Sequence, residues 1–153
     1  MSMKRQKRKE AGYIGSCDTY KIKNDSIFYE DIFINGDPKS FKYLSCSYAK
    51  DTNHVYNGSD EIEGCDPESF EIINNKWQKD NKYYYYFGEA ITYVDYNTFE
   101  LLDVNYSRDK NNVYYYQYIL PNADPSTFQV NSMTHYATDK NYTFFRGKIT
   151  TNH

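Results

Sequence analysis

A fixed period of 29 residues is the feature of this sequence that most restricts its fold. Phenylalanines recur at this interval, and an aspartate stands four residues before each of them. A second series of aspartates keeps the same spacing, with its last member one residue late. Two independent markers with one period indicate that a single structural unit is copied along the chain. The first aspartates are Asp37, Asp66, Asp95 and Asp124, the phenylalanines are Phe41, Phe70, Phe99 and Phe128, and the second aspartates are Asp51, Asp80, Asp109 and Asp139.

Each copy has the chemistry of a turn followed by a β-hairpin. In the recurrent Asp-Pro-x-Ser/Thr-Phe segment, the aspartate can accept hydrogen bonds from the amides beyond it, and proline presets φ for a turn that delivers the Phe ring to the core. Residues 99–108 suit an extended strand, residues 109–112 supply turn residues, and residues 113–120 are rich in β-branched and aromatic residues. Strand, tight turn and strand form a hairpin. A shortened first copy surrounds residues 23–26.

The period therefore predicts an all-β protein of tandem antiparallel β-hairpin repeats. We expect about five hairpins and ten strands, arranged as a curved or two-layered array because sheets of that size usually curl or split. The 153 residues fall within the size range of one domain. We assign residues 13–153 to this repeat domain and residues 1–12 to a basic N-terminal arm.

Charge is distributed unevenly between the arm and the repeats. Five Lys and Arg fall in the first nine residues, which leaves 13 Lys and Arg against 21 Asp and Glu in the rest of the chain, a balance of 13 − 21 = −8. An acidic body repels phosphate groups, so nucleic acid is not an expected partner. No segment approaches the roughly 20 apolar residues of a membrane-spanning helix.

Long motifs repeated in phase connect the sequence to a known family. The phrase Asp109-Lys110-Asn111-Asn112-Val113-Tyr114-Tyr115, with Asp139-Lys140-Asn141-Tyr142 and the Asp-Pro-x-Ser/Thr-Phe turns, resembles the bacterial DKNYY family. The resemblance covers residues 19–149 and implies a repeat architecture. Some members are exported and some occur in gene neighbourhoods that suggest toxin–immunity systems. The resemblance provides no catalytic residues.

Metal and cofactor sites are not expected from the spacing of the polar residues. Asp109 and Asn111 resemble the opening of a calcium loop, but Val113 stands where a third oxygen ligand is required, so we interpret them as an Asx-turn. His54 and His135 lie in different contexts, and no zinc-ligand spacing is present. The sequence predicts no metal ligands and no bound cofactor.

The cysteines favour a reduced, cytoplasmic and non-enzymatic protein. Cys17, Cys46 and Cys65 are an odd number and do not form a complete disulfide framework, so we expect reduced thiols. Cys46 has no recognisable nucleophile signature, and we expect no catalytic residues. Residues 14–17 resemble a lipoprotein cleavage box, but no apolar stretch of about 7 to 15 residues precedes them. A location in the cell envelope would require a native signal peptide that this sequence lacks.

Tyrosine is unusually frequent, with 19 Tyr and 9 Phe beside one Trp. Tyr rings provide apolar burial and are also common on recognition surfaces. Because Tyr115 and Tyr116 are neighbours on one expected strand, we expect their rings on opposite faces. We expect the run 83–87 inside the array, since such a run promotes aggregation on a sheet edge. The candidate partner-binding residues are Tyr84, Tyr86, Tyr115, Tyr116, Tyr118 and His54.

These features favour a non-enzymatic protein-binding module. The leading hypothesis is an immunity-type protein that binds and neutralises a bacterial toxin domain, which an acidic, tyrosine-rich surface would suit if that domain is basic. The alternative is a cell-envelope or surface repeat protein that binds a glycan or another surface ligand through exposed rings. The sequence does not define the oligomeric state.

Overall fold

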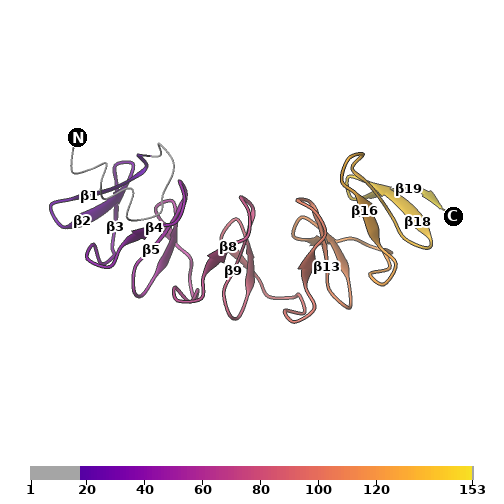
Figure 1. Cartoon of the computed structure of the whole chain (residues 1–153), viewed down its shortest axis with the longest axis horizontal. Coiled ribbons are helices and arrows are strands. Elements are labelled where there is room, and N and C mark those ends of the chain that lie inside the picture. Colours follow the sequence, from indigo (N-terminus) through magenta and orange to yellow (C-terminus); the bar gives the residue numbers. More distant parts are fainter. Residues whose placement is uncertain (1–17, 153) are drawn as a thin grey trace. The chain divides into compact units, whose positions relative to one another are not determined.

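The computed structural model describes residues 18–152, and all of its regular structure is β. Short strands, 19 in number, form five separate antiparallel sheets, one for each expected copy (Figure 1). The predicted all-β hairpin-repeat architecture is confirmed.

The chain divides into two compact units, one that ends at Glu89 and one that begins at Ala90. The predicted basic arm, residues 1–12, lies outside the described residues. Across residues 18–152, no helix is long and apolar enough to cross a membrane.

Each sheet is a meander in which every strand pairs with the strand next to it in the chain. The first sheet has three strands and the others have four. The first contains β1 (Tyr20–Lys23), β2 (Ser26–Tyr29) and β3 (Ile32–Ile34); the second β4 (Lys42–Tyr43), β5 (Tyr48–Lys50), β6 (Val55–Asn57) and β7 (Asp60–Glu61); the third β8 (Glu71–Ile72), β9 (Trp77–Lys79), β10 (Tyr84–Tyr86) and β11 (Glu89–Ile91); the fourth β12 (Glu100–Leu101), β13 (Tyr106–Arg108), β14 (Val113–Tyr115) and β15 (Tyr118–Ile119); the fifth β16 (Gln129–Asn131), β17 (Tyr136–Thr138), β18 (Tyr142–Phe145) and β19 (Lys148–Asn152).

The prediction of about ten strands was wrong, because each expected long strand is itself a hairpin. Residues 99–108 fold as β12, a turn and β13, since the Asp103 carboxylate accepts hydrogen bonds from the amides of Asn105 at 2.7 Å and Tyr106 at 2.6 Å. Residues 113–120 fold as β14, a turn and β15, because Tyr116 adopts a φ of 56°. The central hairpin of each copy was predicted correctly, but it is flanked by two further strands.

The turn before the last strand of each sheet requires a left-handed backbone. Two-residue hairpin loops favour positive φ because this matches the twist of the flanking strands. Non-glycine residues enter this region at a cost of about 1 kcal/mol or more, so the turn geometry is maintained against local preference. The residues at this position are Glu30 (φ 55°), Gly58 (64°), Phe87 (51°), Tyr116 (56°) and Arg146 (50°).

The hydrophobic core lies between consecutive sheets. In the second unit, Tyr106, Val113 and Leu120 of one sheet pack with Phe128 and Phe144 of the next copy. The Phe128 ring lies 5.5 Å from the ring of Tyr106 and is 2 % exposed. No copy buries an apolar face alone, so each copy requires a neighbour, as in other repeat proteins. The corresponding clusters in the first unit contain Tyr20, Ile27, Ile34, Ala49 and Tyr56, and Tyr48, Val55, Ile62, Cys65, Phe70 and Tyr85.

The last sheet differs from the fourth at two positions that are buried there. At the positions of Tyr106 and Val113, which are 2 % and 0 % exposed, it carries Tyr136, 44 % exposed, and Thr143. This face of the last sheet is therefore more polar and more open than the equivalent face of the fourth sheet.

Candidate binding surface

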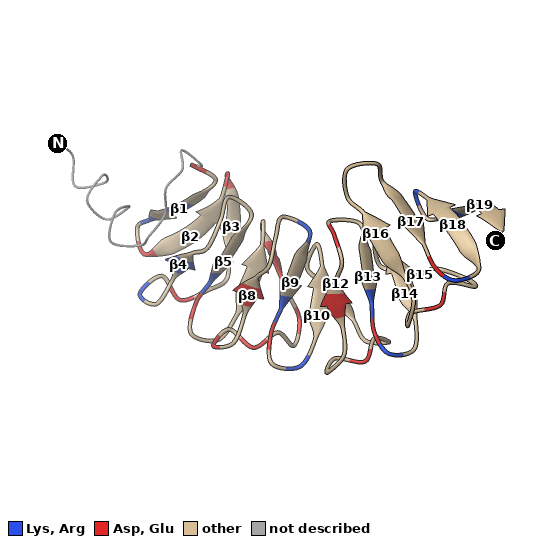
Figure 2. Cartoon of the chain, turned by 45° about the vertical axis from the view of Figure 1, so that its right-hand side comes forward, with Lys and Arg blue, Asp and Glu red and all other residues tan. Residues whose placement is uncertain are grey.

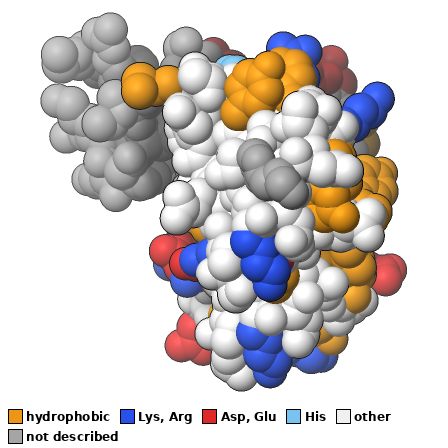
Figure 3. Space-filling view, turned by 90° about the vertical axis from the view of Figure 1, so that its right-hand side faces the viewer, with side chains coloured by type: hydrophobic (Ala, Val, Ile, Leu, Met, Phe, Trp, Pro, Cys, Tyr) orange, Lys and Arg blue, Asp and Glu red, His pale blue; other side chains and the backbone are white. Residues whose placement is uncertain are grey.

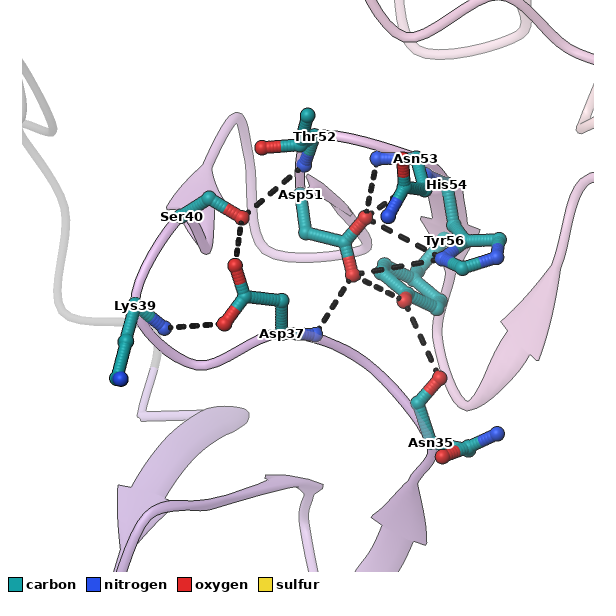
Figure 4. Close-up of polar contacts among 9 residues, drawn as sticks. All are labelled: Asn35, Asp37, Lys39, Ser40, Asp51, Thr52, Asn53, His54 and Tyr56. Carbon is teal, nitrogen blue, oxygen red and sulfur yellow. Dashed lines mark hydrogen bonds and ion pairs between the residues drawn. The ribbon is translucent and has the colours of Figure 1, made fainter.

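A buried carboxylate at the tip of the central hairpin organises each of the last four copies. In the first of them, Asp51 Oδ1 accepts hydrogen bonds from the amides of Asn53 and His54, both at 2.8 Å (Figure 4). Its Oδ2 accepts a hydrogen bond from the amide of Asp37 at 2.8 Å and one from the Tyr56 hydroxyl at 2.8 Å. Asp51 is 4 % exposed. Four donors therefore satisfy a carboxylate that would otherwise be costly to bury.

A serine connects this carboxylate to the Asp-Pro turn. The Ser40 hydroxyl donates to Asp37 Oδ2 at 2.6 Å and accepts a hydrogen bond from the Thr52 amide at 3.2 Å (Figure 4). The Lys39 amide donates to Asp37 Oδ1 at 3.0 Å, as predicted for a capped turn. The two aspartate series seen in the sequence therefore belong to one hydrogen-bond network, which fixes the hairpin tip against the turn.

The network recurs with one informative variation. The hydroxyls of Tyr85 and Tyr114 donate to Asp80 and Asp109 at 2.8 and 2.7 Å. In the last copy, Asp139 Oδ2 still accepts the amide of Asp124 at 2.7 Å, but Phe144 replaces the tyrosine and provides no hydroxyl. The aspartate contacts are thus constant, whereas the tyrosine contact is dispensable.

Hydrogen bonds control the ionisation of these carboxyls. Burial alone would raise the pKa of Asp51, but the amides of Asp37, Asn53 and His54 and the Tyr56 hydroxyl together lower it to about 2. The same balance of burial and donors lowers the pKa of Asp80 and Asp109. Burial, followed by the hydrogen bond to Asp51, raises the pKa of the Tyr56 hydroxyl. At neutral pH the networks of Asp51, Asp80 and Asp109 each pair a carboxylate with a protonated tyrosine.

The repeated aspartates are therefore structural. The amides of Asn111 and Asn112 donate to Asp109 Oδ1, both at 2.8 Å, which confirms the Asx-turn interpretation. Within residues 18–152, no three His, Cys, Asp or Glu side chains converge as a metal site would require. His54 lies beside the network with Nδ1 3.3 Å from Asp51 Oδ1, and His135 is exposed in the turn before β17.

The cysteines differ from expectation. Cys46, in the turn between β4 and β5, is disulfide-bonded, so the expectation of reduced thiols is wrong for this residue. Cys65 is a free thiol in the core between the second and third sheets, and its burial raises its pKa to about 12. Cys17 lies outside the described residues. A thiol with such a pKa is not activated as a nucleophile.

Three of the candidate tyrosines lie together in the second unit. The rings of Tyr115 and Tyr116 are 4.3 Å apart, and Tyr118 is the cross-strand partner of Tyr115. The prediction that Tyr115 and Tyr116 point to opposite faces was wrong, because Tyr116 leaves the strand conformation at its positive φ. Tyr118 is 67 % exposed, whereas Tyr115 and Tyr116 are half-buried. We refer to residues 113–119 as the tyrosine hairpin.

The other candidates lie in the first unit and in two places. Tyr84 and Tyr86 are half-buried on β10, a strand flanked by β9 and β11 as expected for an interior strand. The Tyr86 ring packs on Trp77 at 5.1 Å. His54 is separate from them, at the tip between β5 and β6. Tyr84 and Tyr86 therefore contribute more to packing than to an open surface.

Sequence reasoning missed two exposed residues, Tyr93 beside the tyrosine hairpin and Ile119 within it. Tyr93 is 51 % exposed, and its hydroxyl donates to the carbonyl of Gln117 within this hairpin. Ile119 is 51 % exposed on the edge strand β15. The signal for Ile119 was available, because the residues 29 and 58 positions earlier are Ala90 and Glu61, which marks a departure from the repeat. Tyr93 precedes Gln117 by 24 residues, so only the fold brings the two together.

Charge is distributed differently in the two units. Residues 18–89 contain 8 Lys and Arg and 14 Asp and Glu (8 − 14 = −6), and residues 90–152 contain 5 and 6 (5 − 6 = −1). Red β8 beside blue β9, and red β12 beside blue β13, mark cross-strand ion pairs (Figure 2). These are Glu71 with Lys79 at 3.3 Å and Glu100 with Arg108 at 2.6 Å. The second unit uses each of its carboxylates in an ion pair or a turn, and these carboxylates are Asp95, Glu100, Asp103, Asp109, Asp124 and Asp139.

The fold and this surface define a class of β-meander repeat proteins. In this class a buried aspartate holds each hairpin tip by hydrogen bonds, and aromatic residues are exposed at the sheet edges. Residues 20–148 match the model of the DKNYY family. The chain belongs to the DKNYY family, as its motifs indicated. No curated protein and no solved structure matches it.

The networks predict a graded response to substitution. Tyr114→Phe removes one of four hydrogen bonds and copies the natural arrangement at Phe144, so we expect a loss of about 1 kcal/mol in the free energy of unfolding. Asp109→Ala leaves three amides and a hydroxyl without an acceptor and should cost about 3 kcal/mol or more. Urea unfolding monitored by circular dichroism measures both. Tyr118→Phe is the matched control, and a loss equal to that of Tyr114→Phe would contradict the assignment.

The lowered pKa values predict acid unfolding. The pKa of Asp51 is about 2 in the folded protein and about 3.9 in an unfolded chain. Its contribution of about 2 kcal/mol is therefore complete above about pH 4 and disappears as the pH falls towards 2. We expect a constant urea midpoint between about pH 5 and 7 and a falling one below about 4. Asp51→Asn, which does not ionise, should be less stable at neutral pH and less sensitive to acid; an equal acid loss in both proteins argues against the network.

Proposed function

We propose that this protein is a non-enzymatic protein-binding module of the immunity type, which binds and neutralises a bacterial toxin domain. The observation that carries the proposal is the tyrosine hairpin, where Tyr118 is 67 % and Ile119 51 % exposed beside Tyr93. Tyrosine provides a large and rigid contact area at a low entropic cost, and exposed apolar residues that gather in one place are typical of interaction sites.

The buried tyrosines support this interpretation by contrast. Tyr56, Tyr85 and Tyr114 donate to network carboxylates and are 2 %, 0 % and 1 % exposed. The repeat therefore accounts for tyrosine at that position without reference to a partner. It does not account for Tyr118, which occupies the position of Asp60 in the second sheet. A residue that departs from the repeat and does not stabilise it is a candidate for binding.

The charge of the first unit supports a basic partner. The hairpins that β3 forms with β2 and β7 forms with β6 carry exposed carboxylates and no Lys or Arg. A negative potential of this kind accelerates encounter with a cationic surface and is screened by salt. Toxin domains that act on nucleic acids are often basic for the same electrostatic reason.

A growth assay tests this proposal. Each toxin-like domain encoded beside the gene is expressed in bacteria with and without this protein. We expect co-expression to restore growth against one such domain, and Tyr118→Ala with Ile119→Asp to abolish protection while Val104→Asp, at an equally exposed site in the same unit, retains it. If no neighbouring domain is neutralised, the proposal is wrong.

The Cys46 disulfide favours a second candidate, an envelope or surface repeat protein that binds a glycan or another surface ligand. Disulfides persist mainly in oxidising compartments such as the bacterial periplasm. Exposed aromatic rings such as those of Tyr93 and Tyr118 are suited to stacking on sugar rings as well as to protein contacts. This candidate requires export of the protein.

Cell fractionation with thiol labelling distinguishes the two candidates. The protein expressed from its native gene is separated into cytoplasmic and envelope fractions, and free thiols are alkylated before mass spectrometry. Envelope location with Cys46 protected from alkylation is the outcome expected for the second candidate. Cytoplasmic protein with a fully alkylated Cys46 would exclude it, and alkylation of the buried Cys65 after denaturation is the internal control.

A further inference from the structure

The second unit presents a cationic edge. The last strand of each of its two sheets, β15 and β19, is an outer strand, and these two strands expose Tyr118, Ile119 and Ile149 at 67 %, 51 % and 39 %. Arg146 and Lys148 are exposed in the turn before β19 and at its start, and neither forms an ion pair with another described residue. In Figure 3, Lys and Arg side chains lie among hydrophobic and uncharged ones on the face turned to the viewer, and acidic side chains lie at its margins.

The first unit presents an acidic edge at the same position of the repeat. Its β3 and β7 are also outer strands, and Ile32 and Phe33 on β3 are 55 % and 59 % exposed. The carboxylates on this edge are exposed and form no ion pair with a described residue. No Lys or Arg occurs in residues 25–35 or 54–65. The carboxylates are Glu30 and Asp31 before β3, and Asp60 and Glu61 on β7.

We propose that these two edges bind each other between copies of this chain, so that the acidic edge of one copy docks on the cationic edge of a second. The two edges are complementary in charge, and both expose apolar residues. In the proposed pair, the carboxylates of one copy lie against Arg146 and Lys148 of the other. Ile32 and Phe33 of the first copy pack on apolar side chains of the second, such as Ile119 and Ile149. Both edges also leave backbone groups of an outer strand unpaired in their sheets, and outer strands with exposed apolar residues are prone to pair with another chain.

Charge favours pairing of an acidic edge with a cationic edge over pairing of two identical edges. Pairing of two cationic edges would place Arg146 and Lys148 of one copy next to the same residues of the other. Pairing of two acidic edges would place the four edge carboxylates of one copy next to those of the other. Like charges placed opposite each other at an interface disfavour association. Pairing of unlike edges also predicts that salt weakens the association, because exposed charges are screened.

This inference does not rest on the proposed toxin binding, although both use Tyr118 and Ile119. A toxin domain bound to the tyrosine hairpin and a second copy bound to the cationic edge would exclude each other. Measuring the purified full chain without any toxin separates the two, since self-association can fail while protection in the growth assay succeeds.

Sedimentation velocity of the full chain over a concentration series tests the proposal. We expect reversible self-association that weakens at high salt. Arg146→Glu with Lys148→Glu leaves two acidic edges, and Asp60→Lys with Glu61→Lys leaves two cationic ones, so each double variant alone should associate at least about tenfold more weakly. A mixture of the two variants restores unlike edges and should associate again. Circular dichroism establishes that both variants are folded.

The matched control is Lys39→Glu with Lys42→Glu, which makes the same charge change at exposed residues before and on β4, the opposite outer strand. This control should associate like the original protein at equal salt. A monomer at every concentration would overturn the proposal. So would a control variant that dissociates as far as the Arg146 and Lys148 variant, or a mixture of charge-reversed variants that remains monomeric.

Discussion

The structure depends on a buried carboxylate that accepts four hydrogen bonds at once. The Asp51 side chain accepts a hydrogen bond from the amide of Asn53 in its own turn and another from the amide of Asp37, 14 residues earlier in the chain. One carboxylate thus closes the hairpin tip and holds the Asp-Pro turn against it. Because an unsatisfied buried carboxylate is so unfavourable, the amide donors to this aspartate are kept in each of the last four copies, even where the tyrosine is replaced by Phe144. This explains why both aspartates recur at a fixed interval while the surface residues between them vary.

Packing between copies is the second constraint, and it follows from the size of the sheets. A sheet of three or four strands of two to five residues has too little apolar area to be stable alone, so within each unit consecutive sheets pack their apolar residues together. Phe128 contacts both Tyr106 of the preceding copy and Phe144 of its own. The interior of each copy is therefore determined by its neighbours, and residues that touch no neighbour are available to change.

The period alone was sufficient to predict the repeat, the capped Asp-Pro turn and the Asx-turn, because these depend on residues close in sequence. It did not reveal the outer strands. Ser45, Asn74 and Asp103 also recur at 29 residues and form the turn before the central hairpin, but a single polar residue within an apolar segment is a weak signal. The positive φ of Tyr116 was not predictable from residue type, since tyrosine rarely adopts it; the fold imposes it.

The same constraints explain where function can reside. In the second unit the scaffold engages all six carboxylates of residues 90–152, which leaves Arg146 and Lys148 to set the sign of the edge near the tyrosine hairpin. In the first unit the corresponding edge positions carry carboxylates instead. Exposed outer-strand residues such as Tyr118 and Ile119 belong to neither the networks nor the core clusters, so their identity can change binding with little effect on folding. A repeat of this kind can therefore acquire different partners by substitution along one edge while every buried contact is preserved.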